Sequence, residues 1–161
     1  MRGLVILVLL SAVPSQALAI EKADRVLVEK NAKTLSLYKG QTLLARLPVV
    51  FGGNPAGQKQ QAGDGRTPEG SYLLDAKKAD STFYKAIHIS YPDAKDVESA
   101  KQRGVDPGGA IMIHGQRNLL GWAWFVARHF NWTQGCIALS NQDMDLVWQS
   151  VDAGTPIDIK P

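Results

Sequence analysis

Apolar and polar side chains alternate along two neighbouring segments in the first third of the chain. Arg25–Glu29 and Thr34–Tyr38 follow this period of two, which is typical of strands, and Asn31 and Ala32 between them suit a hairpin turn. A third apolar-rich segment, Thr42–Phe51, follows after one further turn. Because these strands are short and consecutive, they favour a sheet that closes into a sandwich or barrel.

Four later segments continue the β pattern and are expected to be strands: Ser71–Lys77, Lys85–Ser90, Ala110–His114 and Thr155–Lys160. A polar, glycine-rich stretch, Gly52–Gly70, precedes them. Gly52 and Gly57 have the spacing of a phosphate-binding loop, but Gln58 stands where that motif requires lysine, and no Ser or Thr follows it. We therefore expect this stretch to be a long surface loop.

Two segments carry helix signals instead. Pro92–Arg103 predicts a short helix that ends before Gly104. Ser140 is placed to cap a second helix, in which apolar residues recur at helical spacing: Met144, Val147, Trp148 and Val151. The whole pattern predicts one mainly β domain, a sandwich or barrel with a few short helices.

The first nineteen residues differ from the rest of the chain. Met1 and Arg2 give a positive start, an almost unbroken apolar run extends to Val13, and Ala17–Ala19 offers small residues for a signal peptidase. The run is shorter than the roughly 20 residues of a spanning helix. We therefore expect residues 1–19 to be a signal peptide, residues 20–161 to be the exported domain, and no membrane span after cleavage.

Composition excludes several classes of function. The 161 residues include 18 Lys and Arg against 15 Asp and Glu, a balance of +3 without a long basic run, so a nucleic-acid partner is not expected. The single cysteine rules out an internal disulfide and a zinc cluster of several thiolates. The carboxylates are dispersed and the histidines lack ligand spacing, so we expect neither a metal nor another cofactor.

The lone cysteine, Cys136, is the strongest candidate for chemistry. Gly135 precedes it, which allows successive backbone N–H groups to turn toward one point, as in an oxyanion hole. A thiol also needs a base, and His114, at the end of an apolar strand and before a glycine, is the best candidate. His88 could line the site or lie beneath it, and His129 suits a surface position. From these residues alone, a buried and inert cysteine remains the alternative.

Other candidates rest on weaker signals. Arg66 and Arg117 could hold a substrate carboxylate, or could be solvated surface residues. Trp122, Trp124 and Trp132 lie between His114 and Cys136. They could belong to a short helix or lid over a cleft, with Trp132 behind the nucleophile loop, or they could fill the core.

Several of these residues match a known pattern. Ile113–Gly115 followed by Thr133–Ile137 resembles the catalytic motif of the L,D-transpeptidase catalytic domain (YkuD) family, and Thr67–Tyr72 resembles its Thr-Pro-x-Gly-x-aromatic element. His88–Pro92 and Trp132–Ala138 look like one branch of that family. The likeness covers about Arg25 to Lys160. It implies an L,D-transpeptidase-like β-sandwich or barrel with a few short helices, one of them after the cysteine.

The resemblance also implies roles. Cys136 would be the nucleophile that attacks the carbonyl between a meso-diamino acid and D-alanine in a peptidoglycan stem peptide. His114 would be the general base and then the acid, with the Gly115 carbonyl orienting its ring. Backbone N–H groups of Gln134, Gly135 and Cys136 would form the oxyanion hole. Contacts with substrate are expected from five residues: His88, Arg66, Arg117, Trp122 and Thr133.

Three outcomes remain open at the level of the sequence. The thioester could be resolved by an amine, which is transpeptidation, or by water, which would make the chain a hydrolase or amidase, for instance one that releases a wall-attached protein. The domain could also be a non-catalytic envelope-binding module. Many family members carry His or Lys where this chain has Gln134, and Asn or Arg where it has Ala138, so the choice of acceptor is the least certain property.

Overall fold

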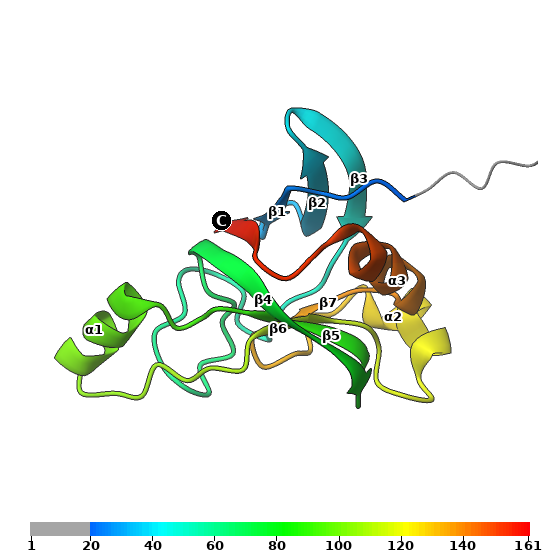
Figure 1. Cartoon of the computed structure of the whole chain (residues 1–161). Helices are drawn as coiled ribbons and strands as arrows, with labels where there is room; N and C mark the ends of the chain where they lie inside the picture. The colour runs from blue at the N-terminus through cyan, green and yellow to red at the C-terminus, as the bar shows by residue number, and fades with distance from the viewer. Residues whose placement is uncertain (1–19) are drawn as a thin grey trace, which may run out of the picture.

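The computed structural model describes residues 20–161, so the predicted signal peptide lies outside the described residues (Figure 1). One eight-stranded sheet runs in the order β3-β2-β1-β8-β4-β5-β6-β7. Its strands are β1 Arg25–Glu29, β2 Thr34–Lys39, β3 Thr42–Pro48, β4 Gly70–Ser81, β5 Tyr84–Ile89, β6 Met112–His114, β7 Ile137–Ala138 and β8 Thr155–Lys160. Three α-helices, α1 Ala94–Gln102, α2 Trp124–Ala127 and α3 Asn141–Ser150, accompany it with one 3₁₀ turn, η1 Gly121–Ala123.

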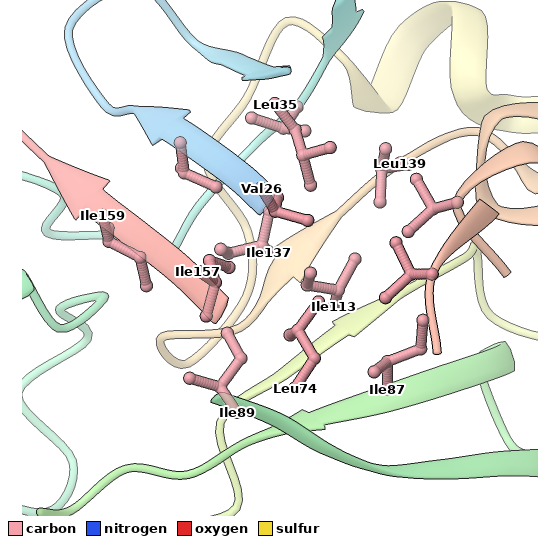
Figure 2. Packing of buried hydrophobic residues seen from close by; sticks show 14 of the residues in the cluster. Val26, Leu35, Leu74, Ile87, Ile89, Ile113, Ile137, Leu139, Ile157 and Ile159 are labelled. Carbon is pink, nitrogen blue, oxygen red and sulfur yellow. The ribbon is translucent and has the colours of Figure 1, made fainter. Parts of the chain in front are cut away.

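The core forms where the first and last strands meet. Strands β1 and β8 pair in parallel, with Val26 beside Ile157 and Val28 beside Ile159. These alternate side chains are buried because successive residues of a strand point to opposite faces. Figure 2 shows Val26, Ile157 and Ile159 converging with apolar residues of β4 to β7, so the two ends of the domain share one core.

The sheet also closes on itself. Beyond β3, the Val50 N–H donates to the Ala138 carbonyl at 3.0 Å, and the Ala138 N–H donates back to Val50 at 2.9 Å. Gly52 pairs next with Thr133. The predicted mainly β fold with short helices is confirmed, and its closure brings the long loop 52–70 against the segment that carries Cys136.

The third predicted strand, Thr42–Phe51, is too long. Strand β3 ends at Pro48, which has no N–H to continue the ladder with β2. Val50 then turns to β7, a two-residue strand that is too short to give a sequence pattern. Strand β4 extends to Ser81, beyond the predicted Lys77, because its exposed end pairs with β5 rather than packing on the core.

Both predicted helices are present. Asp93 caps α1 by accepting from the Lys95 and Asp96 N–H groups. Ser140 caps α3 by accepting from the Asp143 N–H at 3.0 Å, as the sequence predicts. Within residues 20–161, no helix is both long and apolar enough to cross a membrane.

Candidate active site

The register of the last strands places His114 and Cys136 on one face of the sheet. Strands β6 and β7 pair in parallel, with Ile113 beside Ile137 and His114 beside Ala138. Ile113 and Ile137 point into the core (Figure 2). Their chain neighbours must therefore point to the opposite face. There, His114 and Cys136 both line one cavity of about 800 Å³.

The imidazole of His114 is fixed in one orientation. Its Nδ1 lies 2.7 Å from the Gly115 carbonyl oxygen. Because a carbonyl only accepts, Nδ1 carries the proton and Nε2 keeps a free lone pair. Burial lowers the pKa of His114, although the Gly115 carbonyl favours its charged form. The ring is neutral at neutral pH, so Nε2 can accept a proton. Phe83 covers it, with ring centroids 4.7 Å apart.

The thiol of Cys136 is also neutral at rest. Burial raises the pKa of the thiol above its ordinary value, while a backbone hydrogen bond from Met112 and the charge of Lys59 lower it. Among residues 20–161, the thiol donates to the Ala110 carbonyl at 3.6 Å, and no hydrogen bond joins the sulfur to the imidazole. The site therefore holds a neutral thiol and a neutral base, and the thiol ionises only when a base removes its proton.

A single hydroxyl ties the nucleophile loop together. Thr133 Oγ1 donates to the Cys136 carbonyl at 2.7 Å and accepts from the Gly135 N–H at 3.2 Å. Gly135 has φ of +122°, and a Cβ there would lie 2.6 Å from the Arg66 carbonyl oxygen. Only glycine fits this position without movement of the backbone. Thr133 lines the cavity, but its hydroxyl is engaged within the loop.

The three predicted oxyanion donors are not equivalent. The Gly135 N–H already donates to Thr133. In the described part of the chain, the N–H groups of Gln134 and Cys136 have no acceptor. Two unpaired N–H groups beside a nucleophile are what a developing oxyanion requires.

The predicted substrate-binding residues separate into two groups. Arg117 and Thr133 both line the cavity, Arg117 with an exposed side chain and Thr133 with a buried one. Three others lie outside the lining. The Arg66 guanidinium donates to the Gln58 carbonyl at 3.2 Å. His88 Nδ1 lies 2.7 Å from Asp75 Oδ1. Trp122 is 71% exposed.

The prediction from sequence missed Lys78. In the sheet, Lys78 pairs with Ala86 and Ala86 pairs with His114, so the three residues form one row across β4, β5 and β6. Directly paired residues point to the same face, and the small Ala86 leaves the space between Lys78 and His114 open. Lys78 lines the cavity. It could have been found from the sequence only if β4 had been extended past Lys77.

The second wall of the cavity comes from the segment between β6 and the nucleophile loop. Leu120, Ala123, Ala127 and Phe130 of this segment, which includes η1 and α2, line the cavity. Trp132 stacks on Phe83, with ring centroids 6.1 Å apart, and packs edge-on against His114, with ring centroids 5.8 Å apart. Trp132 therefore lines the cavity beside His114 and Phe83, and a short helix borders the cleft.

The sequence of this domain matches a known protein family. A sequence model of the L,D-transpeptidase catalytic domain family, YkuD, matches residues 23–159. The chain belongs to this family. The resemblance found in the motifs is confirmed.

Relatives of the L,D-transpeptidase family agree with this assignment. YafK of Escherichia coli strain K12 is 32% identical over 128 residues, which cover 76% of this chain but 44% of YafK, so the chain spans less than half the length of that relative. A crystal structure of the helical cell shape determining protein Pgp2 from Campylobacter jejuni superposes with a TM-score of 0.65 at 25% identity, over 88% of this chain and 49% of Pgp2. An L,D-transpeptidase from Mycobacterium smegmatis shares the fold, with a TM-score of 0.57 at 16% identity, over 86% of this chain and 59% of that one.

Proposed function

We propose that this L,D-transpeptidase-family chain is an exported cysteine acyltransferase that acts on peptidoglycan stem peptides. The observation that carries the proposal is the shared cavity of Cys136 and His114. The Gly115 carbonyl keeps the imidazole proton on Nδ1, so the unprotonated Nε2 can act as a general base.

In the first half of the reaction, the Cys136 sulfur bonds to the carbonyl carbon of the substrate while its proton passes to Nε2 of His114. The N–H groups of Gln134 and Cys136 stabilise the oxyanion, and Gly135 keeps the loop in shape. The carbon–nitrogen bond then breaks, and the leaving amine of D-alanine takes the proton from Nε2. The product is a thioester on Cys136.

In the second half, an acceptor amine attacks the thioester. Its proton passes through Nε2 to the departing sulfur, which restores the thiol. Water in place of the amine would give hydrolysis through the same groups, including release of a wall-attached protein. The family assignment favours transfer.

The charge of the cavity supports an anionic donor. Lys78 and Arg117 line it, and among the described residues no Asp or Glu does. We propose that both cations attract carboxylates of the stem peptide. Arg66 would support the loop at Gly135 through its backbone carbonyl, which packs against that residue. His88 would contact substrate as part of its pair with Asp75.

The cellular setting is proposed on separate grounds. The pattern of residues 1–19 supports export to the periplasm or cell envelope, with residues 20–161 as the working domain. The likeness to Pgp2, described as a cell shape determining protein, supports a contribution to cell shape through the wall.

A defined muropeptide assay tests the function. The chain is incubated with a tetrapeptide muropeptide and a D-amino acid, and products are separated by mass. We expect a cross-linked or D-amino-acid-exchanged product that disappears in Cys136→Ala. Release of D-alanine alone would make the chain a hydrolase. No product from either protein, together with retained binding of the muropeptide, would make it an envelope-binding module.

A further inference from the structure

Exposed apolar side chains are concentrated in one short segment. In residues 20–161, ten large hydrophobic residues are exposed, and six of them lie between residues 119 and 130. These six form the apolar patch: Leu119, Leu120, Trp122, Phe125, Val126 and Phe130. Leu119 is 94% exposed and Phe125 60%. A cluster of this kind on a folded domain marks an interaction surface.

The patch is held outward by its flanks. The Asn118 N–H donates to the Thr82 carbonyl at 2.9 Å, and its side chain accepts from the Tyr84 N–H at 3.0 Å. The next residue, Leu119, has φ of +69°, a left-handed conformation that is unfavourable for leucine. The fold thus holds Leu119 in a strained backbone conformation with its side chain in solvent. Its exposure is therefore a fixed feature of the loop.

The segment that carries the patch is basic. Between Asp106 and Asp143 the chain has no acidic residue, whereas Arg117 and Arg128 are both exposed. The neighbouring elements add Lys78 and Asp80 from the β4–β5 hairpin. They also add Asp143 and Asp145 from α3, where Asp143 accepts from Ser140 and Asp145 is paired with Lys85. Together the named groups carry four positive and three negative charges, a balance of +1, and the two charges within residues 117–130, Arg117 and Arg128, are both positive.

We propose that the apolar patch docks on an anionic lipid surface. Leucine, valine, tryptophan and phenylalanine beside arginine are the side chains of interfacial membrane contacts. Anionic headgroups would complement Arg117 and Arg128, whereas a second copy of the chain, meeting patch to patch, would bring the same arginines together. Lipid also suits Leu119 and Val126, which have no ring to stack on a sugar.

Docking would orient the cavity. Leu120 and Phe130 belong to the patch and also line the cavity that holds Cys136. A membrane bound to the patch would hold the mouth of that cavity beside the lipid surface. The proposal does not depend on the proposed chemistry, because the patch would bind lipid whether or not Cys136 reacts.

Vesicle co-sedimentation tests the proposal with residues 20–161, which contain all eight strands and the core and exclude the apolar run before residue 20. We expect binding to phosphatidylglycerol–phosphatidylethanolamine vesicles and much weaker binding to phosphatidylcholine. Phe125→Ser should lower the partition coefficient by about tenfold, because the variant has no phenyl ring to insert into the lipid. Arg128→Gln should lower it by about fivefold on the anionic vesicles alone.

The chain supplies a matched control. Val126 and Val97 are both 47% exposed and both helical, but Val97 lies in α1, at the far end of the molecule from α2 (Figure 1). Val126→Ser should weaken binding and Val97→Ser should not. Equal loss in both variants, equal binding to both lipid types, or no binding at all would overturn the proposal. So would a concentration-dependent dimer in sedimentation analysis that Phe125→Ser abolishes, because the patch would then belong to a second copy.

Discussion

The two walls of the cavity are built differently. The catalytic wall, formed by residues 112–114 and 133–138, is tightly packed, with His114, Gly135 and Ala138 buried and the loop closed by the Thr133 hydroxyl. The opposite lid wall, residues 120–130, has no buried residue in η1 or α2. Packing and hydrogen bonds thus fix the side chains of the catalytic wall, whereas the side chains of η1 and α2 are at least partly open to solvent.

The largest expected contrast is between two histidines. His114→Asn should slow acyl transfer by about 10² to 10⁴-fold, because the general base is lost from the catalytic wall. The same change at His129, which is exposed on the lid side, should have little effect on the rate. Steady-state assays with the tetrapeptide donor measure both. A loss below tenfold in His114→Asn would place the base elsewhere.

A second contrast concerns the space available for a side chain at two neighbouring glycines, Gly52 and Gly53. A Cβ on Gly52 would lie 2.0 Å from the Gly65 carbonyl oxygen and 2.8 Å from the Gly135 N, whereas on Gly53 its nearest contact would be 4.0 Å away. Gly52→Ala should therefore lower the free energy of unfolding by about 3 kcal/mol or more, because backbone must move. Gly53→Ala, and Phe125→Ser on the lid wall, should change it by less than about 0.5 kcal/mol.

Urea denaturation measures these three variants. The contrast between the walls fails if Phe125→Ser destabilises the chain as much as Gly52→Ala does. It is sharpened if Gly52→Ala also changes the rate at which iodoacetamide alkylates Cys136, since Gly52 packs against the nucleophile loop.

The pH dependence of stability gives a smaller effect. Burial places the pKa of His114 below its ordinary 6.5. As pH falls below 6.5, the unfolded chain therefore takes up this proton before the folded chain does, and the free energy of unfolding falls until the folded pKa is passed. Above pH 6.5 the ring is neutral in both states and this loss is absent.

His114→Asn should remove this part of the acid-side loss, and His129→Asn should retain it. Unfolding free energies of the three proteins between pH 8 and pH 5 check the expectation. A slope that is unchanged in His114→Asn would mean that the buried ring does not titrate as its environment implies.

The smallest effect is expected from the cations at the cavity. Lys78→Gln and Arg117→Gln should each raise KM for the tetrapeptide by about twofold to fivefold, with kcat nearly unchanged, because exposed charges interact weakly with a ligand. Lys95→Gln in α1 is the control. The effect should shrink as salt rises. An effect on kcat alone would argue against a role in binding the carboxylate.

Much of the catalytic wall could be predicted from sequence because its features are local. Each of these features can be recognised within a few residues: the Gly-Cys and His-Gly pairs, the capping Ser140 and the alternating pattern of the strands. What could not be predicted depends on register across the sheet. Lys78 reaches the cavity only through its pairing with Ala86, and β7 exists only because Val50 closes the sheet onto it.

The exposed lid wall illustrates the other limit. Its tryptophans suit either a core or a surface in the sequence, and only the packing separates Trp132, stacked on Phe83, from the outward Trp122. The hydrogen bond from the Gly135 N–H to Thr133 likewise depends on the conformation of the loop, which residue spacing does not reveal.

We propose that Cys136, activated by His114, forms an acyl thioester. Intact-protein mass spectrometry after exposure to a carbapenem tests it most directly, because opening of the strained lactam by the thiol adds the whole drug to the protein. We predict one adduct on the wild type, slower formation in His114→Asn and none in Cys136→Ala. An unmodified wild type, or an adduct that persists in Cys136→Ala, would mean that Cys136 is not the reacting nucleophile.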